Sequence, residues 1–161
     1  MISELSKSRS HIDVLLSCDK LNIMQWRFTG FYGEPRREWW KERWYLLWFL
    51  RAQSDAPWLC LGDFNEVLTV EEQFGVNEQE PWQVAAFQVV INDCHFSDLG
   101  FSGLPYTWDN RQEGNRNVKV RLDRAFADDR LLSAVGETDV LHVPLAELDH
   151  CGLVVTMRDR C

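Results

Sequence analysis

Hydrophobic and polar positions along the chain predict strands interleaved with two longer helices. Apolar runs predict strands from His11 to Cys18 and from Ile23 to Tyr32. Residues 36–53 then carry apolar side chains at helical spacing, and Pro35 stands where the first turn of a helix tolerates proline. A second helix with one apolar face is predicted to begin near Pro81.

The other strands are predicted from shorter patterns. The unbroken apolar run 57–61 is typical of a strand buried on both faces. Apolar and polar side chains alternate strictly from Val118 to Asp123, which predicts a strand over 118–126 whose polar side is an ordinary outer face. Further elements are expected at 97–99, 106–108, 140–143 and 151–157 (strands) and at 128–135 (a short helix). Because strands outnumber helices and helices fall between strands, the fold class is α/β (α+β), with a sheet covered by helices.

Composition narrows the class of protein. The chain has 161 residues, of which 45% are hydrophobic and 26% charged, so one domain with a substantial core is expected and disorder is excluded. The net charge of -8 argues against a basic nucleic-acid coat protein. The acidic surplus lies in residues 59–161, which fits a metal-using site but by itself favours an ordinary soluble surface.

The cysteines and the apolar runs indicate the cellular compartment in which the protein is expected. The five cysteines form no C-x-x-C pair, so neither a disulfide framework nor a zinc site is predicted. The first seven residues lack the apolar stretch of a signal peptide, and the run Trp44–Leu50 is too short to span a bilayer. We therefore expect an intracellular protein, nuclear or cytoplasmic and not secreted, with no membrane partner.

Polar residues at strand ends are the candidates for chemistry, and Asp63, Asp123 and His150 are expected to converge there. Asp63 and Asn65 follow a buried strand two positions apart, so both point the same way and together can orient a water and hold a phosphate oxygen. The alternative is a turn in which both side chains cap local backbone. Tyr32, which ends another strand, either donates to a phosphate or is a half-buried aromatic residue.

A histidine and a second carboxylate complete the set. His150 could stabilise a charged phosphoryl oxygen with Asp123 fixing its tautomer; otherwise it is an ordinary edge histidine. Asp149 and His150 can serve one site only at a strand entry, before regular pleating begins. Trp108 lies close to five Arg/Lys between 111 and 124, the combination that a nucleic-acid backbone groove needs. The other three histidines are interpreted as structural.

These motifs, in this order, resemble the endonuclease/exonuclease/phosphatase (DNase I-like) superfamily, and most of all the apurinic-type endonuclease domain of plant LINE-like (non-LTR) retroelements. The resemblance runs from about His11 to Thr156 and rests on five motifs: Trp26–Gly33, Gly62–Asn65, Tyr106–Trp108, Arg121–Arg124 and Asp149–His150. It implies a four-layered α/β sandwich that cuts DNA phosphodiesters with Mg²⁺ as cofactor.

The resemblance also implies roles for individual residues. Asp63 would activate the attacking water, and His150 paired with Asp123 would stabilise the transition state. Asn65, Tyr32 and Thr107 would contact the scissile phosphate. Asn65 would also be a catalytic residue. Asp149 would be the metal ligand.

Two family motifs do not occur in this sequence: an asparagine-bearing first strand and a Glu-Thr-Lys strand whose glutamate binds the metal. Residues 1–161 are therefore expected to form one partial, N-terminally truncated domain with an incomplete magnesium site. Two hypotheses stay open. One is a Mg²⁺-dependent endonuclease that nicks DNA; the other is a catalytically inactive fold remnant that binds nucleic acid or protein weakly. The missing glutamate favours the second.

Overall fold

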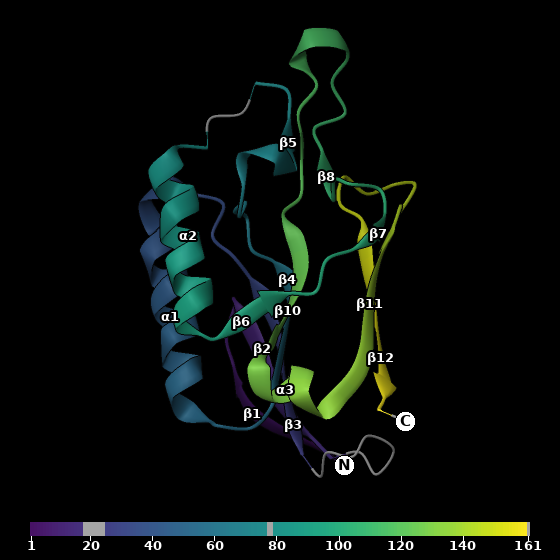
Figure 1. Cartoon of the computed structure of the whole chain (residues 1–161). Helices are drawn as coiled ribbons and strands as arrows, with labels where there is room; N and C mark the ends of the chain where they lie inside the picture. Colours follow the sequence, from purple (N-terminus) through teal and green to yellow (C-terminus); the bar gives the residue numbers. More distant parts are fainter. Residues whose placement is uncertain (18–24, 77–78, 161) are drawn as a thin grey trace.

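A six-stranded sheet forms the centre of the protein in the computed structural model, which describes residues 1–17, 25–76 and 79–160. Its strand order is β1-β2-β3-β4-β10-β6 (Figure 1). The strands span Ile2–Lys7 (β1), His11–Leu16 (β2), Trp26–Tyr32 (β3), Trp58–Asp63 (β4), Asp123–Asp128 (β10) and Phe96–Asp98 (β6). β3 and β4 run parallel, and the other neighbours are antiparallel.

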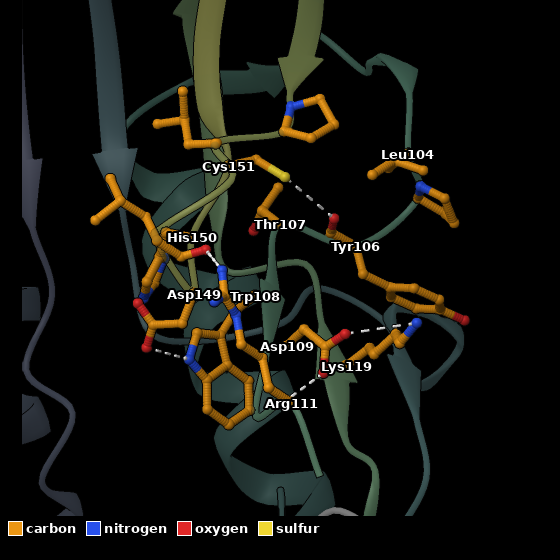
Figure 2. A pocket seen from close by; sticks show the side chains of 14 residues that line it. Leu104, Tyr106, Thr107, Trp108, Asp109, Arg111, Lys119, Asp149, His150 and Cys151 are labelled. Carbon is orange, nitrogen blue, oxygen red and sulfur yellow. Dashed lines mark hydrogen bonds and ion pairs between the residues drawn. The ribbon is translucent and has the colours of Figure 1, made fainter. Parts of the chain in front are cut away.

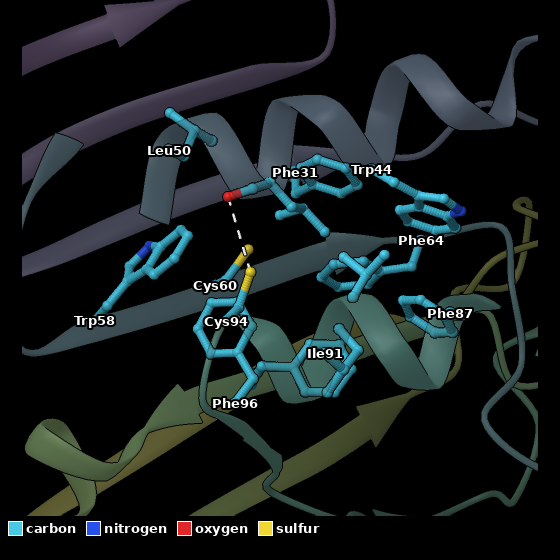
Figure 3. Close-up of a cluster of buried hydrophobic side chains, with 13 residues drawn as sticks. Phe31, Trp44, Leu50, Trp58, Cys60, Phe64, Phe87, Ile91, Cys94 and Phe96 are labelled. Atoms are coloured by element: carbon cyan, nitrogen blue, oxygen red, sulfur yellow. Dashed lines mark hydrogen bonds between the residues drawn. The ribbon is translucent and has the colours of Figure 1, made fainter. Parts of the chain in front are cut away.

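Two helices cover one face of this sheet. They are α1 (Trp40–Gln53), preceded by the 3₁₀ turn η1 (Arg37–Trp39), and α2 (Pro81–Asp93). Glu80 and Gln83 form a capping box at the start of α2, with Pro81 in its first turn. Figure 3 shows the aromatic cluster beneath the helices, in which Trp44 stacks on Phe87 at a ring distance of 5.0 Å. Four of the eight tryptophans of the chain belong to this cluster or pack against it: Trp40, Trp44, Trp48 and Trp58.

The opposite face of the central sheet carries a second, three-stranded sheet. It has the order β12-β11-β7 and comprises Gly152–Asp159, Val135–Val143 and Ser102–Gly103, with α3 (Asp129–Ala134) leading into β11. Leu59 of β4 and Ala127 of β10 pack against Leu131 and Val135 between the sheets. Helix pair, central sheet and second sheet make three layers, so the described residues contribute three of the four layers expected for the sandwich.

A small third sheet continues from the central one. It has the order β5-β9-β8 and comprises Gln73–Phe74, Lys119–Val120 and Trp108–Asp109, flanked by the 3₁₀ turns η2 (Val70–Glu72) and η3 (Gly114–Arg116). The chain between β8 and β9 projects from the body as a finger (Figure 1). The predicted continuous strand over 118–126 is therefore wrong: it divides into β9 and β10, which belong to different sheets.

Buried ion pairs explain this division. Arg121 and Arg124 both bind Glu72 and Asp98 at 2.7–3.0 Å, and the guanidinium of Arg124 is fully buried. The predicted outer polar face is wrong at Arg121 as well as at Asp123, because both side chains are buried. Two arginines can be buried here because two carboxylates reach them from other segments.

The predicted helices and most predicted strands are confirmed. The ends of two predicted strands, at Cys18 and at Ile23, lie outside the described residues. β1 was not predicted, because an exposed edge strand with the sequence ISELSK has no period-two apolar pattern. In the described part of the chain, no helix is both long and apolar enough to cross a membrane.

A buried salt bridge joins β2 to β3 and gives the first prediction. Arg27 donates to both oxygens of Asp13, and both side chains are 1% exposed. Asp13→Ala should lower the free energy of unfolding by about 3–5 kcal/mol, because it leaves a buried guanidinium without its carboxylate. Urea denaturation measures this loss. Glu4→Ala, which removes a carboxylate exposed on β1, is the control and should change little; equal effects of the two substitutions would contradict the assignment.

Candidate active site

Three strands of the central sheet end side by side and bring the first site residues together. In the register of β3, β4 and β10, Tyr32 lies beside Asp63, and Asp63 lies opposite Asp123. Gly62 allows this close pairing, since a Cβ atom there would lie 1.9 Å from the carbonyl oxygen of Phe31. The row Tyr32–Asp63–Asp123 is therefore a direct consequence of strand register.

The turn after β4 fixes the orientation of Asp63. Its Oδ1 accepts a hydrogen bond from the backbone N–H of Asn65 at 2.8 Å. Asn65 has a positive φ of 54°, a conformation that asparagine tolerates better than most residues. Its side-chain amide donates to the carbonyl of Gly33 at 3.0 Å. The alternative of local capping therefore describes Asp63 but not Asn65, whose amide binds a carbonyl 32 residues away. The contact of Asn65 with a phosphate stays a prediction.

His150 reaches the same row from the second sheet. It lies just before β12, where an isolated bridge pairs it with Trp108 of β8. Its Nδ1 lies 2.8 Å from Oδ2 of Asp123, and its Nε2 lies 3.9 Å from Oδ2 of Asp63. The predicted convergence of Asp63, Asp123 and His150 at strand ends is confirmed, as is the position of His150 at a strand entry.

The electrostatics of the group follow from this geometry. Burial and the neighbouring charge of Asp123 raise the pKa of Asp63 to about 6. The hydrogen bond to Asp123, helped by the charges of Asp63 and Asp149, raises the pKa of His150. An imidazolium between two carboxylates compensates the repulsion that their register creates.

Thr107 has a positioning role that the sequence did not suggest. The side chain is buried, and its Oγ1 accepts hydrogen bonds from the backbone N–H groups of Leu122 and Asp123, both at 2.9 Å. These bonds satisfy the backbone where the chain passes from the small sheet into β10. They fix Asp123, and the contact of Thr107 with a phosphate stays a prediction.

Asp149 lies apart from the row. Its carboxylate is exposed and accepts a hydrogen bond from the indole Nε1 of Trp108 at 3.3 Å (Figure 2). Asp149, His150, Thr107 and Trp108 border a largely apolar cavity of about 320 Å³. Asp149 is thus next to His150 in sequence and is oriented by an aromatic residue.

The residues at the site fit a divalent cation through their carboxylates. Ligand atoms of Asp63, Asp123 and His150 all lie within 4.8 Å of one another, and among the described residues this is the group of three that could hold a metal. Carboxylate oxygens are the donors that Mg²⁺ prefers, whereas imidazole suits other metals. Asp149 is not a member of this group, and its role as a metal ligand stays a prediction.

The predicted basic stretch beside Trp108 is only partly available to a ligand. Arg121 and Arg124 are buried in ion pairs, so the prediction is wrong for these two. Arg111 and Arg116 are exposed on the finger, and Lys119 pairs with Asp109 at 3.5 Å. Of the histidines predicted to be structural, His11 and His142 are buried and hydrogen-bonded.

Solved structures show the class of fold. The endonuclease domain of TRAS1, a telomere-specific non-LTR retrotransposon, superposes with a TM-score of 0.73 at 16% identity, over 98% of this chain and 68% of that one. The 3′ phosphatase NExo from Neisseria, bound to product DNA hairpin, gives 0.66 at 16% identity, over 97% and 70%. The AP endonuclease LMAP from Leishmania major gives 0.66 at 17% identity, over 95% and 56%.

These likenesses define a DNase I-like fold, of which the chain spans about 56–70%. No curated protein matches the sequence. The Endonuclease/Exonuclease/phosphatase family matches residues 5–145, which is most of the chain. The protein therefore belongs to this family of metal-dependent phosphodiesterases and nucleases.

The raised pKa of Asp63 predicts how stability depends on pH. Its folded pKa of about 6 lies above the ordinary value of 3.8, so the folded state holds the proton more tightly. The free energy of unfolding should therefore fall as pH rises from about 4 to 6. The Asp63→Asn variant should lack this fall, and at pH 7 its free energy of unfolding should exceed that of the parent by up to about 3 kcal/mol. His150, with its raised pKa, adds stability below pH 6.5 that is lost as pH rises through its folded pKa.

Urea denaturation between pH 4 and pH 7 measures the effect. Glu147→Gln is the control, because it makes the same carboxylate-to-amide exchange at an exposed position. A pH profile of Asp63→Asn parallel to that of the parent would show that Asp63 titrates normally.

Proposed function

We propose that Asp63, Asp123 and His150 form the hydrolytic centre of a Mg²⁺-dependent enzyme that nicks DNA, of the kind found in retroelement endonucleases. The observation that carries this proposal is the chain of contacts Asp123–His150–Asp63, with 2.8 Å and 3.9 Å between the facing atoms. It joins two sheets at one point, where a phosphodiester could meet an acid–base pair and a cation.

Each member of the centre has a distinct task in this proposal. Asp63 takes the proton of the attacking water, and its pKa of about 6 suits a general base near neutral pH. Asp123 holds the imidazole by its Nδ1, so that Nε2 of His150 faces the reacting phosphate. The protonated imidazole then stabilises the charge that develops on the phosphoryl oxygens.

A bound Mg²⁺ would supply charge neutralisation at the phosphate. The carboxylates of Asp63 and Asp123 offer oxygen donors, and Asp149 is the further ligand that the family resemblance implies. Tyr32 is half exposed beside Asp63, where its hydroxyl can hold a phosphate oxygen.

DNA is the proposed substrate on three grounds. The matched NExo structure is bound to a DNA hairpin, and TRAS1 and LMAP are named as endonucleases. On this chain, Arg111 and Arg116 are exposed on the finger, and Arg111 lines the same cavity as Trp108. Guanidinium groups next to an aromatic ring suit a nucleic-acid backbone.

A second candidate function is binding of nucleic acid without cleavage. The observation that favours it is the position of Asp149, which does not join Asp63, Asp123 and His150 in one metal-holding group. A lone exposed carboxylate holds Mg²⁺ weakly. Such a protein would keep the fold and the exposed arginines but would not hydrolyse the phosphodiester.

Nicking rates of single variants test the proposed function. Asp63→Asn and His150→Ala should each slow Mg²⁺-dependent nicking of supercoiled plasmid by about 10²–10⁴-fold, because both act on groups whose charge changes in the transition state. Tyr32→Phe should cost less, since Tyr32 chiefly holds the phosphate. If the parent chain nicks no faster than Asp63→Asn, the second candidate function holds.

Thermal unfolding tests how tightly the site holds magnesium. Because Asp149 is the only metal ligand that the family resemblance carries over, the affinity for Mg²⁺ should be weak, and the protein should gain less than about 1 kcal/mol from millimolar Mg²⁺, since stabilisation grows as RT ln(1 + [L]/Kd). The melting temperature with Mg²⁺ and with EDTA measures this gain. A clear rise that Asp149→Ala abolishes would show a tighter site, with Asp149 among its ligands.

A further inference from the structure

The segment that leads into the finger is paired with the segment that leads into β12. The backbone N–H of Cys151 donates to the carbonyl of Thr107 at 2.7 Å, and the backbone N–H of Asp109 donates to the carbonyl of Asp149 at 3.1 Å. The two segments thus lie side by side as a short antiparallel ladder. His150 projects from the backbone between these two hydrogen bonds, so its position depends on this pairing.

Arg111 adds a third contact to the same segment. Its guanidinium donates to the carbonyl of Leu148, the residue before Asp149 (Figure 2). Together with the two backbone bonds, this contact holds the chain on both sides of the pair Asp149 and His150. The base of the finger therefore binds the segment that supplies a side chain to the hydrolytic centre.

The backbone of Arg111 has a conformation that is costly for a long side chain. Its φ of 54° lies in the left-handed region, where a residue with a Cβ atom meets steric hindrance. Its N–H donates to Oδ1 of Asp109 at 2.7 Å, and this oxygen is also held by the side-chain amide of Asn117 at 2.8 Å. Strained residues persist where the surrounding contacts impose them, and they concentrate at functional sites. Here the imposed turn places the guanidinium against Leu148.

We propose that Arg111 is a positioning residue of the hydrolytic centre, because it fixes the backbone that carries Asp149 and His150. Through the carbonyl of Leu148 it restrains this backbone without touching the reacting atoms. A displacement of a reacting group by about 1 Å is enough to slow catalysis strongly. The expected effect on the rate rests on the proposed function, whereas the effect on the position of His150 does not.

The ring signals of His150 test the assignment without any need for cleavage. In proton–carbon correlation spectra at one fixed pH, these signals are identified by their loss in His150→Ala. Arg111→Gly should shift them, because glycine adopts the left-handed turn without strain but has no guanidinium. Signals of His11 on the distant strand β2 should stay in place and show that the variant is folded.

Arg130→Ala is the matched control for this spectrum. Arg130 is also an exposed arginine whose guanidinium donates to a backbone carbonyl, that of Asp55. It lies on α3, which follows the end of β10 opposite to Asp123. The control therefore removes the same charge and the same kind of hydrogen bond, and the signals of His150 should not move.

Nicking kinetics separate positioning from contact with DNA. Arg111→Gly should lower kcat at saturating DNA by about 10–100-fold, because the reacting groups lose their fixed position. Arg116→Ala, which removes the other exposed arginine of the finger, should raise KM without lowering kcat, since it removes only a cation that faces the nucleic-acid backbone. Arg111→Lys should recover part of kcat, because an ammonium group can also donate to a carbonyl.

The outcomes separate this assignment from the proposed function. Unshifted His150 signals in Arg111→Gly, or equal shifts in Arg130→Ala, would overturn the positioning role and leave the hydrolytic centre as proposed. A loss confined to KM, or a lysine variant no faster than the glycine variant, would overturn it as well. In a protein that never nicks DNA, a shift specific to Arg111→Gly would support the positioning of His150 and contradict cleavage.

Discussion

The pairing register of three strands is the constraint on which the rest of the site depends. Because β4 lies between β3 and β10, Tyr32, Asp63 and Asp123 must end in one row. Such a register places two carboxylates side by side in a partly buried position, which is unfavourable unless a positive charge joins them. His150 supplies that charge, and it does so from a different sheet. This contact ties the second sheet to the central one at the site, in addition to the apolar packing of Leu59 and Ala127 against the second sheet.

The contacts around β10 meet this requirement. Thr107 binds the backbone at the start of β10, and the backbone of Cys151 in turn binds the carbonyl of Thr107 at 2.7 Å. One residue thus holds Asp123 and the segment after His150 in a fixed relation. The pairs of Arg121 and Arg124 with Glu72 and Asp98 anchor the same region from the other side. Because removing one member would leave a buried charge, the strand has little freedom to shift its register.

Sequence patterns predicted most of the fold and the convergence of the site, because both depend on local signals. Alternation, helical spacing and polar residues at strand ends identified both helices and the group Asp63, Asp123 and His150. The prediction failed where long-range pairing decides the outcome. Arg121 alternates like an outer-face residue, yet carboxylates 49 and 23 positions away in the chain allow it to be buried. The role of Thr107 likewise depends on what packs around it, which no local pattern records.

The turn from Asp63 to Glu66 contains two carboxyl groups whose burial lowers the stability of the folded protein. Asp63 and Glu66 are both carboxyl groups whose pKa burial raises, so each destabilises the folded protein at neutral pH. Phe64 offsets this cost: its ring is fully buried, stacks on Phe31 and meets Phe126 edge-on, both at 5.0 Å. Anchored by that ring, the turn holds Asp63 opposite Asp123 and keeps Glu66 buried. The two buried carboxyl groups thus lower the stability of the folded protein at neutral pH, and the burial of Phe64 offsets part of that loss.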